Sequence, residues 1–89
     1  MENYFVVEVY ADYNERMTIE NGGVVTSDDY NDAKELLKVR YDFIKDRLNS
    51  ANLVLGVIKQ YKGTNNPYEN DELLYSELIN LKNGHSIIM

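Results

Sequence analysis

Acidic side chains are concentrated in the first third of the chain, and their spacing indicates the chemistry available to them. Residues 1–33 hold eight acids against one basic residue, Arg16. Along a strand, side chains at i and i+2 share a face about 6.8 Å apart, comparable to neighbouring phosphates on a nucleic-acid strand. We therefore predict that a set of carboxylates imitates a phosphate backbone: Glu8, Asp12, Glu15, Glu20, Asp28, Asp29 and Asp32. The alternative is an acidic surface that only confers solubility.

The cluster of Asp28, Asp29 and Asp32 has two further interpretations. Hard divalent cations take several oxygen ligands, so these carboxylates could hold one. Acids are also favoured at the start of a helix, where the helix dipole attracts negative charge. We favour the helix start, and we predict neither a metal site nor a cofactor.

Tyrosine supplies a second candidate binding feature, since the chain contains eight. Tyr10 belongs to a segment with strand periodicity, and Tyr13 lies in the turn predicted to follow it. Tyrosine offers a large rigid contact area, while acids steer a basic partner. We predict Tyr10 and Tyr13 as anchors among the acids of a partner-binding surface. Tyrosines that merely shield the sheet are the alternative.

Few side chains in this sequence are of the types that commonly act in catalysis. The chain has no cysteine, and its only histidine, His85, stands beside the turn-forming pair Asn83-Gly84. A lone histidine in a turn is more often solvated than catalytic, and it has no thiolate with which to share a metal. The sequence also lacks a glycine-rich phosphate loop, a nucleophile elbow and a metalloprotease motif. We predict that the protein is not an enzyme.

Length and composition limit the architecture and the partners. A chain of 89 residues, 44% of them hydrophobic, can build one modest core, so we expect a single domain over residues 1–89. The net charge of −6 disfavours direct contact with DNA or RNA. The lack of cysteine suits the reducing cytoplasm. Neither a basic run before an apolar stretch nor a span of roughly 20 apolar residues is present, so we expect neither secretion nor a membrane partner.

The first half of the chain predicts strands followed by a helix. Period-two alternation predicts a strand at residues 4–11, with one side facing the core (Phe5, Val7, Val9 and Ala11) and the other facing solvent (Tyr4, Val6, Glu8, Tyr10 and Asp12). Residues 16–20 return as a hairpin, and Asn21-Gly22 predicts a second turn before a short arm at 23–26. Thr26 and Ser27 predict the cap of a helix that runs to about Asn49.

The second half of the chain predicts further strands. Residues 52–61 form an apolar run typical of a central strand, and the polar residues 62–70 form a surface loop. Residues 71–81 fit either a helix capped by Asn70 or a strand, and we favour the strand because the apolar residues 86–89 need a pairing partner. The prediction is an α+β fold of order ββ(β)αββ, an antiparallel sheet of four to five strands with one long helix packed on one face.

In size, charge, absence of cysteine and acid clusters, the chain resembles the small acidic phage-encoded inhibitors that disarm bacterial defence proteins, anti-CRISPR proteins among them. These inhibitors share no common fold, so the resemblance transfers no functional residue. It implies that the protein blocks a basic nucleic-acid-binding surface on a larger protein, such as a CRISPR nuclease, in the cytoplasm of a host bacterium. The alternative is a structural or regulatory module that forms a homodimer or joins a larger assembly through its exposed sheet face.

Overall fold

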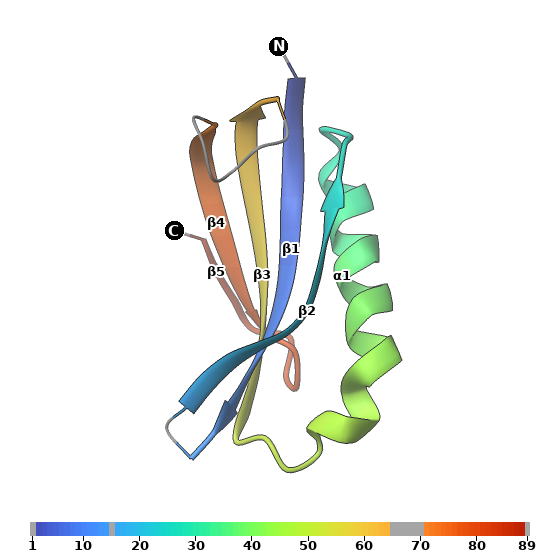
Figure 1. The fold of residues 1–89 in the computed structure, drawn as a ribbon, viewed down its shortest axis with the longest axis vertical. Coiled ribbons are helices and arrows are strands. Elements are labelled where there is room, and N and C mark those ends of the chain that lie inside the picture. Colours follow the sequence, from blue (N-terminus) through green and yellow to red (C-terminus); the bar gives the residue numbers. More distant parts are fainter. Residues whose placement is uncertain (1, 15, 65–70, 89) are drawn as a thin grey trace.

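The structure is a computed structural model that describes residues 2–14, 16–64 and 71–88. Five antiparallel strands form one sheet, and a helix packs on one face of it (Figure 1). The order of strands across the sheet is β2-β1-β3-β4-β5. The elements are β1 (Glu2–Tyr13), β2 (Arg16–Val25), α1 (Tyr30–Ile44), the 3₁₀ turn η1 (Lys45–Leu48), β3 (Leu53–Gly63), β4 (Glu72–Asn80) and β5 (Ser86–Ile88). The predicted α+β class and helix position are confirmed.

The core lies between α1 and the sheet. Phe5, Val7 and Val9 alternate along β1 and are buried against Leu37 and other apolar residues of α1 and η1. Each such side chain contributes about 1.5–3 kcal/mol when it is fully buried. The helix packs mainly on β1 and β2. One helix covers one sheet face, so in the described ranges of the chain the opposite face has no helical layer (Figure 1).

The turn predicted at Asn21-Gly22 is wrong, because both residues lie inside the continuous strand β2. They pair with Val9 and Glu8 of β1, and Glu20 is the extra residue of a bulge. A Cβ atom at Gly22 would approach the carbonyl oxygen of Val7 to 2.9 Å. The glycine therefore permits close approach of two strands, which is a second common use of glycine in sheets.

The helix starts slightly later than predicted, because Asp29 is its N-cap. The Asp29 carboxylate accepts a hydrogen bond from the backbone N–H of Asn31 at 2.9 Å. Ser27, one of the two predicted caps, instead accepts a hydrogen bond from the backbone N–H of Asp29 at 2.9 Å. A side chain that closes this preceding turn is not available to cap the helix, so the cap moves to Asp29.

The strand interpretation of residues 71–81 is confirmed, since β4 covers Glu72–Asn80 and pairs with β5. Gly84 has a φ of +83° in the connecting turn, and its backbone N–H donates to the carbonyl oxygen of Asn80 at 2.7 Å. β3 lies at the centre of the sheet, as predicted. Residues 65–70 of the predicted surface loop lie outside the described residues.

Candidate functional site

The sheet face turned away from α1, here called the open face, carries most of the exposed large apolar side chains in the described residues. Strand pairing places Val6, Glu8 and Tyr10 of β1 on this face, together with Val57 and Lys59 of β3. The exposed apolar residues around them are Met17, Ile19 and Val24 of β2, Leu73 and Leu74 of β4, and Ile87 of β5. Exposed apolar patches of this kind mark interaction sites in proteins.

A groove of about 600 Å³ runs over the open face. Leu55 and Val57 lie in it, with Met17 and Leu74 among the residues that line its sides. Val57 is only 5% exposed although no helix covers it, because neighbouring side chains rise around it. The groove is an open surface feature and not an enclosed cavity, so its shape suits a macromolecular surface.

A pair of opposite charges occupies the groove. The Lys59 ammonium lies 2.9 Å from Oε1 of Glu8, and the Tyr10 hydroxyl donates to the same oxygen at 3.2 Å. Burial acts to lower the pKa of Lys59, but the hydrogen bond and the negative charge of Glu8 outweigh it, so the pKa lies above its usual value. The ammonium is therefore charged at neutral pH, and the groove is locally neutral.

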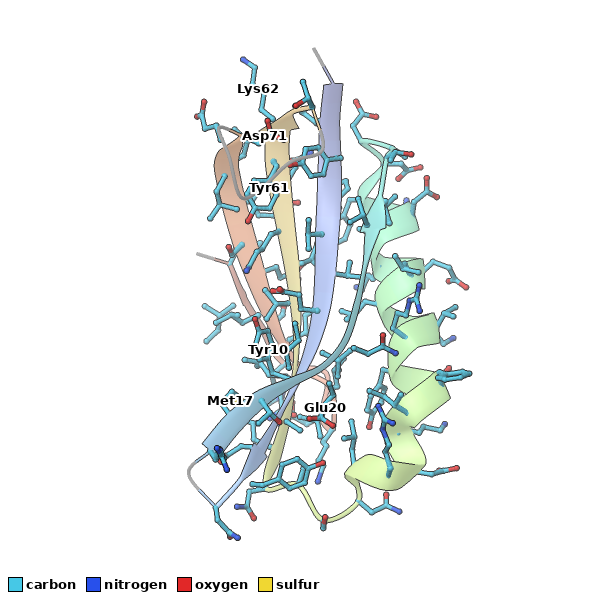
Figure 2. The ribbon with its side chains drawn as sticks, in the orientation of Figure 1. Tyr10, Met17, Glu20, Tyr61, Lys62 and Asp71 are labelled. Carbon is cyan, nitrogen blue, oxygen red and sulfur yellow. The ribbon has the colours of Figure 1, made fainter. Side chains whose placement is uncertain are left out.

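Tyr4 is not exposed on the open face as predicted, because it is only 2% accessible. Its ring stacks on Tyr61 with centroids 5.5 Å apart, and its hydroxyl donates to Asp71 at 2.6 Å. Asp71 also accepts the backbone N–H of Thr64 at 3.0 Å. This end of the open face is closed by side chains from three separate segments, with Tyr61 and Asp71 close together near the upper end of the sheet in Figure 2.

Of the residues predicted to bind a partner, Glu8 and Tyr10 lie in the groove. Asp12 is half-buried near the end of β1, opposite Met17. Tyr13 does not accompany them, since it is the last residue of β1 and packs against the hydrophobic core. Sequence periodicity ended the strand too early and placed Tyr13 in a turn. Glu15 lies outside the described residues.

The remaining predicted acids lie elsewhere. Glu20 points toward α1 (Figure 2), and its carboxylate accepts the Thr18 hydroxyl at 2.7 Å. Asp28, Asp29 and Asp32 surround the start of α1, at the opposite end of the molecule from the β1–β2 turn (Figure 1). The carboxylates are thus divided among several surfaces. In the part of the chain that the structure describes, no three acids or histidines come together as a metal site.

Sequence reasoning missed Lys59 and the apolar residues of the groove. The available signal was the run at residues 53–58, where apolar side chains occupy both alternating positions. One set faces α1, so the other set must face the side that the helix leaves uncovered. What the sequence could not reveal was the cross-strand position of Lys59 beside Glu8, which depends on the pairing register.

Comparisons with protein-family models, curated proteins and solved structures found no match to this chain. Among the described residues, no helix combines the length and apolar character needed to cross a bilayer.

Proposed function

We propose that this protein acts by binding another protein chain through its open face, as a structural or regulatory module without catalytic activity. The observation that supports this proposal is the apolar groove, which has a neutralised charge pair within it and is covered by no helix of the described residues. An apolar centre with polar groups in satisfied pairs is the composition of protein–protein interfaces. Tyr10 and Met17 in the groove are of residue types enriched at such interfaces.

The experiment compares two variants that add the same charge to different faces. Leu74→Asp places a carboxylate in the groove, whereas the control Val39→Asp places one on the exposed side of α1; the two positions are 41% and 53% exposed. Both variants are first checked for native circular dichroism. Affinity capture from the source cells, and measurement of molecular mass in solution, then report the association of each form.

We expect native association for Val39→Asp and loss of association for Leu74→Asp, because a buried unpaired carboxylate is costly at an apolar contact. Equal association of the two variants would contradict the proposed role of the open face.

Inhibition of a basic nucleic-acid-binding protein, such as a nuclease, is a second candidate function. It is favoured by the exposed carboxylates Asp28, Asp29 and Asp32 at the start of α1, none of which takes part in the ion pairs recorded among the described residues. The double variant Asp28→Lys/Asp32→Lys reverses charge here and spares the cap residue Asp29. If this candidate is correct, the native chain inhibits a basic nuclease and the double variant does not. Equal inhibition by the two forms would contradict it.

A further inference from the structure

We propose that the partner of the open face is a second copy of this chain, related to the first by a twofold axis that passes over the Glu8–Lys59 pair. This inference rests on the proposed function, because it names the occupant of the same groove. Twofold dimers use one patch on both copies, so the patch must be complementary to itself. The open face meets this requirement in its charge and in the positions of its exposed apolar residues.

The strand register gives the open face an apolar residue at each end and a charge pair near the middle. On β1, the open-face positions run from Tyr4, opposite Tyr61, to Asp12, opposite Met17. Leu73 lies opposite Tyr61 and so marks the Tyr4 end, while Met17 marks the Asp12 end. Glu8 is midway between these ends, about 13 Å from each at the usual rise of a strand.

Met17 lies on β2 and Leu73 on β4, so they stand at opposite corners of the face, with their midpoint between β1 and β3 near the Glu8–Lys59 pair. A twofold axis that lies in the interface and crosses the strands obliquely over this midpoint exchanges the two corners. Met17 of one copy then lies over Leu73 of the second copy, and the same contact forms on the other side of the axis. Both residues are about half exposed in the single chain, at 47% and 48%. Both therefore have apolar area to bury in such a contact, which is favourable in proportion to the area removed from water.

The charge pair is complementary to itself around the same axis. Glu8 and Lys59 lie 2.9 Å apart, and their side chains retain 15% and 28% of their exposure. In the dimer, each carboxylate meets the ammonium of the second copy in addition to its own. A strongly basic partner would find no net negative charge at this pair, whereas a second copy finds one acid and one base. The charge pattern thus favours a second copy over a basic protein.

The test uses charge reversal at each member of the pair. Glu8→Lys gives two lysines per groove, so two copies of this variant place like charges together and are expected to be monomeric. Lys59→Glu gives two acids per groove and is expected to be monomeric for the same reason. Mixed one to one, the two variants present lysines to acids, and we expect a heterodimer. A purely intrachain role for the ion pair predicts no recovery on mixing.

Sedimentation velocity over a range of concentrations measures each outcome, with circular dichroism as the check of folding. The native chain and Val39→Asp should reach twice the monomer mass, and Leu74→Asp should remain monomeric although its substitution lies on the surface. A monomeric native chain at every concentration, or a mixture that stays monomeric, would overturn the second-copy inference. If Leu74→Asp failed to capture a different protein that the native chain and Val39→Asp both capture, the open face would still be a binding site. If Leu74→Asp captured that protein as well as the native chain does, the proposed function would fail too.

Discussion

A buried carboxylate connects two distant segments of this small protein. Glu77 of β4 faces the core and is only 6% exposed. It accepts a hydrogen bond of 2.5 Å from the hydroxyl of Tyr30, the first residue of α1. The Tyr30 ring meets Phe5 edge-on, with centroids 6.4 Å apart. A buried carboxylate requires such a donor, so this contact fixes the start of the helix over the sheet.

We predict that Tyr30→Phe lowers the free energy of unfolding by about 1–3 kcal/mol, because it leaves the Glu77 carboxylate buried without its donor. Tyr41→Phe is the matched control. Tyr41 also packs from α1 against the core, and no hydrogen bond of its hydroxyl is recorded in the described part of the chain. Urea unfolding of the two variants measures the difference. Similar losses for both would show that the Tyr30–Glu77 contact has no special role.

The same contact predicts a loss of stability at alkaline pH. Burial, followed by the hydrogen bond and negative charge of Glu77, raises the pKa of Tyr30 from 10.0 to about 12. The folded state therefore favours the neutral hydroxyl, and this contribution is complete below pH 10.0 and is lost as the pH rises toward about 12. In Tyr30→Phe, the unfolding free energy should fall less steeply over this range than in the native chain. Parallel pH profiles would contradict the prediction.

At the scale of elements, the turn of the β4–β5 hairpin requires a positive φ at Gly84, and the cost of this backbone conformation can be measured separately from side-chain packing. Gly84 has a φ of +83°, and a Cβ atom placed on it would meet no heavy atom within 4 Å. A substitution here therefore changes the backbone energy without creating a clash. The strand interpretation of residues 71–81 depends on this turn, because it returns the chain to pair along β4.

We predict that Gly84→Ala lowers the free energy of unfolding by about 1–2 kcal/mol, the cost of a left-handed backbone for a residue with a Cβ atom. Gly84→Asn should cost less, because asparagine tolerates this conformation better than alanine does. Thermal and urea unfolding report both values. An alanine variant as stable as the native chain would mean that the turn readily adopts another geometry.

On the scale of the whole molecule, charge and apolar surface are separated. The net charge is −6, yet the charge pair in the groove is neutral and the exposed acids Asp28, Asp29 and Asp32 lie at the start of α1. When two copies meet through their open faces, the repulsion between them comes from the net negative charge of each copy, because the charge pair in the contact is neutral. The molecule is elongated, with extents of 41 × 23 × 21 Å, so the ends of each copy lie far from the centre of the groove.

We therefore predict that added salt tightens self-association. Salt screens the repulsion between the exposed charges of two acidic copies over a Debye length of about 10 Å at 0.1 M. The Glu8–Lys59 pairs, enclosed in the contact, are screened much less, and the apolar contact does not depend on charge. Sedimentation at low and high sodium chloride gives the dissociation constant in each condition. A basic partner bound through carboxylates would show the opposite trend, with weaker binding as salt is added.

Several elements could be predicted from the sequence because their signals are local. Alternation at residues 4–11 predicts most of β1, the apolar run at 53–58 predicts a central strand, and Asn83-Gly84 predicts the last hairpin. The α+β class follows from the order of these elements. Short-range periodicity and turn chemistry contain this information, since each depends on residues close together in the chain.

Only the tertiary structure decided which side chains share a surface. Pairing between β1 and β3 places Lys59 beside Glu8, although 51 positions separate them in the sequence, and pairing with β2 absorbs Asn21-Gly22 into a strand. Packing buries Tyr4 and partly buries Tyr13, and the fold places the acids at the start of α1 apart from Glu8 in the groove. The physical reason is that the register between distant strands selects the neighbours of each residue, and a shift of one residue would move every side chain to the other face.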